Sequence, residues 1–193
     1  MLLLSQLMTA TTPLAEQLRD LLRDRSVTRG DFVLASGRRS GFYIDARRTT
    51  MSAEGLAVIG PLALERFAAV GWRPQLVGGL TLGADPVAYA IAAASLSRPP
   101  ALDAFTVRKQ AKDHGTGKRI EGCFAPGATV VIVEDVITTG QSALEAIRAV
   151  EREGGRVLGV LAVVDREEGG RTALEQAGYH VQVLVTATDL GLR

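Results

Sequence analysis

Residues 130–142 read Val-Val-Ile-Val-Glu-Asp-Val-Ile-Thr-Thr-Gly-Gln-Ser, and the rest of the chain is best understood from this stretch. The apolar β-branched run at 130–133 predicts a strand that is buried on both faces. Glu134 and Asp135 stand where that strand is expected to end, and an amphipathic helical pattern starts at residue 143. The stretch therefore predicts a strand, a tight turn and a helix N-terminus, with two acids at a sheet edge.

The turn after the two acids suits a bound phosphate. Residues 138–142 are small and polar, and they lead into a helix N-terminus, where backbone N–H groups lack partners and the helix dipole is positive. Glu134 and Asp135 are acceptors, which repel phosphate but suit hydroxyl groups beside it. A phosphate close to a vicinal diol describes a ribose 5-phosphate. The alternative interpretation is a core strand that happens to end in acids before a capped helix.

Strands and helices alternate along most of the chain. Strands are predicted at 75–77, 104–107, 130–133, 157–164 and 181–185, and helices at 85–94, 143–153 and 172–177. This alternation predicts an α/β fold with a mainly parallel sheet flanked by helices. Ligands of such sheets bind beyond the carboxyl ends of the strands, where the loops 78–83, 135–142 and 165–171 are expected.

The N-terminal part has a different pattern. Its predicted elements are a helix that starts at Thr12-Pro13, short strands at 31–35 and 41–45 around the basic turn 36–40, and a helix from Ser52. Gly60-Pro61 is expected to bend or divide this second helix, because proline cannot donate a helical hydrogen bond.

Composition excludes several classes of protein. A chain of 193 residues with 47% hydrophobic side chains is expected to form one folded domain. Its net charge of +1 provides no general attraction to nucleic acid or to a membrane surface. The lone Cys123 cannot form an internal disulfide, and no apolar run approaches the ~18 residues of a membrane helix. We expect a soluble, cytoplasmic protein without nucleic-acid or membrane partners.

Residues 108–122 interrupt the alternation. They contain five basic side chains, three glycines and almost nothing apolar, so they are expected to form a surface loop rather than to pack into the core. A P-loop is rejected, because Arg119 stands where a serine or threonine is required and Lys112 where the first glycine belongs. Alone the segment would be interpreted as a solvated loop, but beside a phosphate site it is a candidate lid.

Taken together, these stretches resemble a known family. Residues 130–142 resemble the ribose-phosphate signature of the type I phosphoribosyltransferases. Residues 108–115, which read Arg-Lys-Gln-Ala-Lys-Asp-His-Gly, look like the catalytic loop of the orotate phosphoribosyltransferases. The turn 36–40 and its aromatic strand are similar to the orotate-binding hairpin of that family, and Asp165-Arg166 matches the position where the family holds the orotate carboxylate. Two departures are Ala35, where some members have lysine, and the stretch 78–83, which lacks the Tyr-Lys that some members carry.

The resemblance implies an enzyme and a fold. The reaction would transfer the 5-phosphoribosyl group from 5-phosphoribosyl 1-diphosphate to orotate, which gives orotidine 5′-monophosphate and pyrophosphate in pyrimidine (UMP) biosynthesis. The fold would be a single type I phosphoribosyltransferase domain with a small N-terminal hood at about 12–50 and a flexible catalytic loop at about 109–122. The family also implies Mg²⁺, held mainly by the substrate rather than by the protein, and a homodimer whose loops reach the neighbouring subunit's site.

The resemblance also implies residue roles. The expected catalytic residues are Lys112, Asp135 and His114. The diphosphate substrate is expected to contact Arg108, Lys109, Lys112, His114, Glu134, Asp135, Val136, Ile137, Thr138, Thr139, Gly140, Gln141 and Ser142. Orotate is expected to contact Thr138, Arg166, Tyr43 and Ile44. The basic side chains and Mg²⁺ would neutralise the leaving pyrophosphate, and the acids would face the ribose as it becomes positive.

Two other functions stay open at this point. One is a phosphoribosyltransferase that acts on another base, against which residues 112–115 and the N-terminal hairpin argue. The other is a regulatory module of the same fold that senses the ligand, which usually needs a nucleic-acid surface or an added winged helix.

Overall fold

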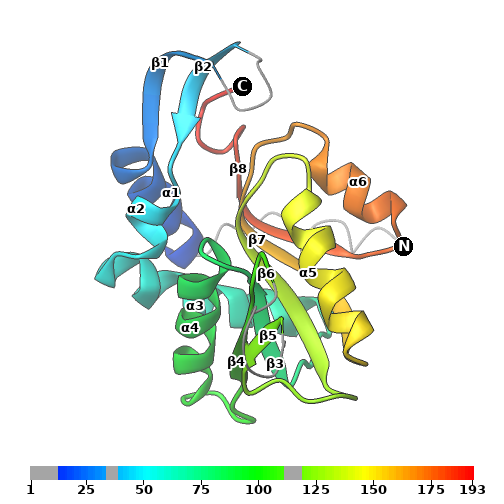
Figure 1. The fold of residues 1–193 in the computed structure, drawn as a ribbon. Coiled ribbons are helices and arrows are strands. Elements are labelled where there is room, and N and C mark those ends of the chain that lie inside the picture. The colour runs from blue at the N-terminus through cyan, green and yellow to red at the C-terminus, as the bar shows by residue number, and fades with distance from the viewer. Residues whose placement is uncertain (1–12, 34–38, 111–118) are drawn as a thin grey trace, which may run out of the picture.

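The computed structural model describes residues 13–33, 39–110 and 119–193, and it shows a six-stranded sheet with helices on both faces and a two-stranded hairpin at one end (Figure 1). The helices are α1 Pro13–Arg25, α2 Arg47–Thr50, α3 Ala53–Val70, α4 Ala84–Ser95, α5 Gln141–Arg152 and α6 Gly170–Gln176. The strands are β1 Val27–Val33, β2 Arg39–Ile44, β3 Leu76–Leu80, β4 Asp103–Val107, β5 Ile120–Gly122, β6 Thr129–Ile137, β7 Arg156–Asp165 and β8 Val181–Thr186. No helix in the described part of the chain is both long and apolar enough to cross a membrane.

The large sheet has the strand order β5-β4-β3-β6-β7-β8. All its neighbouring pairs are parallel except β4 and β5, so the expected mainly parallel α/β sheet is confirmed. The central strand β6 pairs with β3 on one side and with β7 on the other. Its residues 130–133 are fully buried, because helices cover both faces of the sheet.

Alternate residues of β6 divide the core into two halves. Val131 and Val133 pack on the side of α1, α3 and α4, whereas Val130 and Ile132 pack on the side of α5 and α6. This is the geometry of an extended strand, in which successive side chains point to opposite faces. The same division is visible in Figure 1, where α3 and α4 lie on one side of the sheet and α5 and α6 on the other.

The second helix of the N-terminal part, α3, begins where the sequence predicts. The Ser52 side chain accepts a hydrogen bond from the Gly55 N–H and so caps the helix. Gly60-Pro61 does not divide this helix, because one helix runs from Ala53 to Val70, and the alternative of a bend stays a prediction. Gly60 instead permits close packing, since a β-carbon there would lie 2.3 Å from the Ala90 carbonyl oxygen of α4.

The N-terminal hairpin differs from the prediction in its bounds. Strand β1 begins at Val27 rather than at residue 31, and it pairs with β2 through an irregular register between Arg29 and Phe32. The hairpin is tied to the helices at its base, where the hydroxyls of Ser26 and Thr49 form a buried hydrogen bond of 2.7 Å. Ala35 and most of the basic turn lie outside the described residues.

Two segments that were expected to be loops are strands. Residues 120–122 form β5, because Ile120 pairs with Val107 and buries its side chain at the sheet edge. Gly78 and Gly79 belong to the buried strand β3 rather than to a loop. A β-carbon would lie 2.2 Å from the Phe105 carbonyl oxygen at Gly78 and 2.2 Å from the Val133 carbonyl oxygen at Gly79, so glycine is needed for packing at both positions.

Candidate active site

The site is built at the carboxyl end of β6, which runs further than the sequence suggested. Val136 and Ile137 continue the parallel pairing with β7, opposite Val164 and Asp165. Glu134 and Asp135 therefore lie within the strand and not beyond it, which corrects the expected boundary. Because neighbouring side chains of a strand point to opposite faces, the two acids do not share one orientation.

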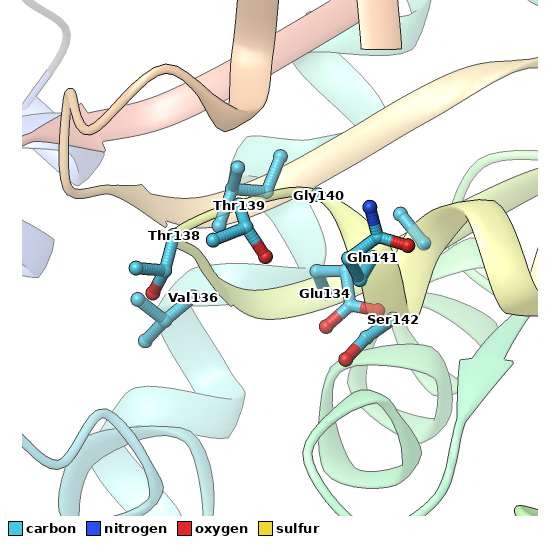
Figure 2. Close-up of a pocket in the computed structure, with 9 residues that line it drawn as sticks. Glu134, Val136, Thr138, Thr139, Gly140, Gln141 and Ser142 are labelled. Carbon is cyan, nitrogen blue, oxygen red and sulfur yellow. The ribbon is translucent and has the colours of Figure 1, made fainter. Parts of the chain in front are cut away.

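A pocket of about 80 Å³ lies between the end of β6 and the start of α5 (Figure 2). Its lining consists of Glu134, Val136, Ile137, Thr138, Thr139, Gly140, Gln141, Ser142 and Ala143. All of these except Ala143 were expected to contact the diphosphate substrate. Asp135 is absent from the described residues that line it. The structure thus brings together the small polar residues of the turn and only one of the two acids.

The pocket has the properties of an anion site. Helix α5 has Gly140 as its N-cap, and no side chain caps it. Its first backbone N–H groups therefore face the pocket region without a capping partner, at the positive end of the helix dipole. Gly140 has φ 80°, and a β-carbon there would lie 2.9 Å from the Gly170 carbonyl oxygen, so glycine is required at this position.

Glu134 forms the floor of the pocket as a neutral acid. Only 5% of its surface is exposed, and its Oε1 has no hydrogen-bond partner among the described residues. Burial raises the pKa of Glu134 to about 8, and the nearby charge of Asp135 contributes further. The carboxyl is thus protonated at neutral pH in the unliganded protein, and it can donate as well as accept a hydrogen bond.

Asp135 lies on the other side of the strand, beside the turn after β3. A β-carbon on Gly83 would lie 2.5 Å from Asp135 Oδ1, so the backbone of this turn is in contact with the carboxylate. Burial raises the pKa of Asp135, while the Val136 N–H at 2.8 Å and the charge of Arg47 oppose that shift. Arg47 is held in turn by Asp45, with 2.8 Å between Nε and Oδ1. Sequence reasoning missed Arg47, because Arg47 and Asp135 lie far apart in the sequence and no local pattern connects them.

Arg166 joins the end of β7 to the N-terminal hairpin. Its side chain is buried, its Nε and Nη2 each lie 2.9 Å from Glu168 Oε1, and its Nη2 makes no hydrogen bond of good geometry. The guanidinium carbon lies 5.0 Å from the centre of the Phe42 ring, which is a cation–π distance. Phe42 was not predicted as a site residue, although its position in the aromatic strand of the hairpin was the available signal.

The other two predicted orotate residues of the hairpin occupy different environments. Tyr43 is 42% exposed, and its ring packs 5.8 Å from that of Phe32. The Ile44 side chain is buried in the core, so the structure does not present it to a ligand and only its backbone is available. The predicted contact of Ile44 with orotate therefore stays a prediction, and it would be made through the backbone.

The described ends of the basic segment are held by ion pairs. Arg108 lies 3.5 Å from Glu121, and Arg119 donates to the carbonyl oxygens of Arg108 and Lys109 at 2.9 and 3.1 Å. Arg119 also forms an ion pair with Glu145 of α5, the helix that starts at the pocket. The predicted catalytic residues Lys112 and His114 lie outside the described residues.

Comparisons with known proteins agree with this fold and site. Residues 53–177 match the family model of the phosphoribosyl transferase domain. Orotate phosphoribosyltransferase of Mycobacterium avium is 47% identical over 180 residues, which cover 93% of this chain and 98% of the relative. The corresponding enzyme of Aquifex aeolicus is 44% identical over 178 residues, or 91% of this chain and 96% of the relative.

Solved structures show the same relationship. The crystal structure of Mycobacterium tuberculosis orotate phosphoribosyltransferase with Fe(III) dicitrate has a TM-score of 0.84 and 46% identity, and the match covers 93% of this chain and all of that one. The complex of that enzyme with 5-phospho-α-D-ribosyl 1-diphosphate has a TM-score of 0.79 at 43% identity, with 93% and 100% coverage.

The mainly parallel sheet, the pocket at the start of α5 and the match of residues 53–177 to the family model show that the chain belongs to the phosphoribosyltransferase family. Nearly full-length identity of 44–47% places it among the orotate phosphoribosyltransferases of that family.

Proposed function

We infer that this chain transfers the 5-phosphoribosyl group from 5-phosphoribosyl 1-diphosphate to orotate, giving orotidine 5′-monophosphate and pyrophosphate in pyrimidine biosynthesis. The observation that carries this inference is the anion pocket at the start of α5, in a chain whose nearly full-length relatives are orotate phosphoribosyltransferases. The 5′-phosphate binds the backbone N–H groups and hydroxyls of residues 138–142. The ribose lies over the end of β6, within reach of Glu134 and Asp135.

The acids act on the ribose as its anomeric bond breaks. The sugar gains positive charge in the transition state. An anionic oxygen beside it therefore stabilises the transition state more strongly than the ground state. Asp135 provides that charge. Glu134 is protonated before the substrate binds, so it positions a ribose hydroxyl by hydrogen bonding rather than by charge.

Orotate is recognised on the hairpin side of the site. Arg166 offers two parallel N–H donors, which fit a carboxylate better than a single ammonium group does. The Phe42 ring beneath the guanidinium holds it in place. Binding of the orotate carboxylate is expected to compete with Glu168 for the same donors. Thr138 and the hairpin residues Tyr43 and Ile44 complete the proposed contacts, with Ile44 acting through its backbone.

Mg²⁺ fits this donor set as a substrate-held ion. Mg²⁺ prefers oxygen ligands, keeps several waters and usually binds through one or two carboxylates together with phosphate oxygens. The half-buried Asp135 carboxylate, within β6 near its end, would contact the waters of such an ion, and the phosphate oxygens of the substrate would hold the ion itself. The ion would neutralise charge on the diphosphate. Arg108, Lys109, Lys112 and His114 are proposed to neutralise the departing pyrophosphate.

The domain organisation and the assembly of the chain are also part of the proposed function. The chain forms one domain, with a hood at about 12–50 and a catalytic loop at about 109–122, and it assembles as a homodimer in which that loop serves the neighbouring site. Support for this comes from the family resemblance. A cytoplasmic location remains a prediction.

The deciding experiment follows orotate by its absorbance in the presence of Mg²⁺ and 5-phosphoribosyl 1-diphosphate. We expect orotate to be consumed at a rate that depends on both partners. Asp135→Asn is the matched control, because it keeps the shape of the side chain but removes its charge, and its kcat is expected to fall far more than its affinity for the diphosphate. If the kcat of Asp135→Asn stayed within about threefold of wild type, the proposed role of Asp135 would be wrong.

Two outcomes would favour the other functions. Consumption of uracil or a purine in place of orotate would indicate a different base. Tight binding of the diphosphate without any turnover would indicate a ligand sensor of the same fold.

A further inference from the structure

Asp85 connects the turn after β3 to the neighbouring strand. It lies in the first turn of α4, and each of its two carboxylate oxygens accepts one hydrogen bond. Oδ2 accepts from the hydroxyl of Thr81 at 2.7 Å, and Oδ1 accepts from the hydroxyl of Thr106 on β4 at 2.8 Å. One carboxylate thus ties the turn, the helix and the strand together.

The turn is held at its start by two kinds of bond. The Thr81 N–H donates to the Val107 carbonyl oxygen at 2.9 Å and extends the pairing of β3 with β4. The hydroxyl of the same residue is the group bonded to Asp85. On the outer side, the Tyr89 hydroxyl lies 3.3 Å from that of Thr106, so α4 and β4 are linked a second time. Thr81 has little freedom to move while Asp85 accepts its hydroxyl.

The other end of the turn, at Gly83, contacts Asp135 of β6. Gly83 lies so close to Asp135 that even a β-carbon on it would be 2.5 Å from Oδ1. The second restraint on that carboxylate is the Val136 N–H, which donates to Oδ1 at 2.8 Å. The turn backbone and this N–H therefore limit how the carboxylate of Asp135 can rotate and how much water reaches it.

We propose that Asp85 is a positioning residue of the active site, which acts through Thr81 and Gly83 to hold the Asp135 carboxylate in its orientation. The inference rests on the proposed function for its effect on turnover. Asp85 does not line the pocket at α5, and its oxygens are occupied by the two threonine hydroxyls. Its contribution is geometric, and a small displacement of a group that acts in the transition state lowers the rate more than the affinity.

The first test uses a matched pair of variants at Thr81. Thr81→Val keeps the shape of the side chain and loses the hydroxyl, whereas Thr81→Ser keeps the hydroxyl. We expect the valine variant to lower kcat about tenfold, with KM for orotate within about twofold, and the serine variant to retain nearly full activity, because a hydrogen bond to a charged acceptor is lost in only one of them. Equal activity of the two variants would overturn the proposal.

The second test asks whether the effect passes through Asp135. Thr81→Val is combined with Asp135→Asn in a double-mutant cycle. If Thr81 acts only by positioning Asp135, the valine change has almost no effect on kcat once that charge is gone. A full tenfold loss in the double variant would show instead that Thr81 contacts substrate directly, and the proposal would be wrong.

The third test does not depend on turnover. The carboxyl ¹³C resonance of Asp135 is identified by its loss in Asp135→Asn and followed with pH in the unliganded protein. Burial raises the pKa of Asp135, and Arg47, Asp45 and Glu134 are the charged or titratable groups around it. Added water lowers the midpoint, so we expect a lower midpoint in Thr81→Val than in wild type or Thr81→Ser. An unchanged midpoint would contradict the proposal even if the wild type proved inactive on orotate, so failure of the function and failure of this inference are separable.

Discussion

At the scale of single residues, the burial of Glu134 in the pocket is energetically unfavourable in the unliganded protein. The Glu134 carboxyl group is buried, and its Oε1 loses hydration without gaining a hydrogen bond from the described residues of the unliganded protein. The protein lowers that cost by keeping the group protonated, as the pKa of about 8 indicates. A ribose hydroxyl in the proposed complex would provide the missing hydrogen bond. Under the proposed function, the burial of Glu134 serves ribose binding rather than folding.

This leads to a prediction for stability. Between the unperturbed pKa of 4.5 and the folded pKa of about 8, the folded state retains a proton on Glu134 that the unfolded state has released. The free energy of unfolding therefore falls as pH rises through this window, and the contribution of the group is lost above it. Glu134→Gln removes this titration. The difference in free energy of unfolding between the variant and the wild type should therefore be roughly 3–5 kcal/mol more favourable to the variant at pH 8 than at pH 5. Urea unfolding at several pH values between these limits measures the difference. Parallel curves for the two proteins would contradict the pKa of Glu134.

Arg166 provides a second prediction, on substrate choice. Arg166→Ala removes the proposed partner of the orotate carboxylate, so KM for orotate should rise by at least about tenfold while affinity for the diphosphate stays nearly unchanged. The preference for orotate over uracil should narrow, because uracil has no carboxylate. Steady-state kinetics with each base measure both effects.

The control for Arg166 is Arg171→Ala. Arg171 is exposed and forms a helical ion pair with Glu175 at 2.8 Å, away from the hairpin. Its loss should leave both KM values unchanged. If Arg166→Ala weakened both substrates equally, Arg166 would be a phosphate contact or a structural residue and not the orotate anchor.

At the scale of elements, glycines decide how closely helices and strands approach. Gly79 lets β3 lie against β6 and α4, since a β-carbon there would be 2.2 Å from the Val133 carbonyl oxygen and 2.7 Å from Ala84 Cβ. Gly60 does the same for the helix pair α3 and α4. These contacts set the distance between the turn after β3 and the end of β6, and so the place of Asp135.

Gly60→Ala tests this packing, because two effects predict opposite signs. Helix propensity favours alanine by about 1 kcal/mol at an interior position. Crowding against the Ala90 carbonyl oxygen and Ala94 Cβ, at 2.3 and 2.8 Å, opposes it. We expect crowding to win and to lower the free energy of unfolding by about 1–3 kcal/mol. Denaturant unfolding measures the change.

The matched control for Gly60 is the reverse change at an exposed position of the same helix. Ala57→Gly should lower the free energy of unfolding by only about 1 kcal/mol, which is the difference in helix propensity between alanine and glycine. A gain of stability in Gly60→Ala would show that α4 moves away without cost and that the close approach is not important.

At the scale of the whole molecule, α1, the hairpin and the C-terminal segment are held together beside the proposed orotate side of the site. Arg23 and Arg29 donate to the carbonyl oxygens of Asp189 and Gly191, so the first helix and the hairpin hold the C-terminal segment. Thr188 donates to Glu167 through both its N–H and its hydroxyl, at 2.7 Å each. Because Glu167 follows Arg166 directly, the orotate side of the site depends on contacts between residues far apart in the sequence.

The proposed sharing of the loop between subunits gives a prediction for the assembly. Lys112→Ala and Asp135→Ala, each inactive alone, are unfolded together and refolded as a mixture. A hybrid dimer with loops acting in trans contains one site with both defects and one intact site. Random pairing makes half of the dimers hybrids, so activity should recover to roughly a quarter of wild type.

The control is each variant refolded with itself, which should stay inactive. Different affinity tags on the two variants show whether hybrids have formed. If each loop serves its own subunit, every site in a hybrid keeps one defect and no activity returns. A mixture that contains hybrids without any recovery would exclude the shared site but leave the roles of Lys112 and Asp135 intact.

The sequence by itself determined the α/β class, the central strand and the polar turn that leads into α5. These features depend on periodicity and on neighbours in the chain, as the buried run 130–133 and the turn residues 138–142 illustrate. Local patterns also located the start of α3 at Ser52, because a capping side chain acts on the next few residues. The resemblance of four separate stretches to one family added the function.

The tertiary structure decided what depends on partners distant in sequence. Pairing with β7 extended β6 beyond Glu134 and Asp135, pairing with β4 made a strand of 120–122, and close packing placed Gly78 and Gly79 inside β3. The same holds for chemistry, since the neutral state of Glu134 follows from its burial and from Asp135 beside it. The contact of Phe42 with Arg166 joins residues from opposite ends of the chain, which no local pattern records. Strand ends, burial and pKa values are set by surroundings that exist only once the chain has folded.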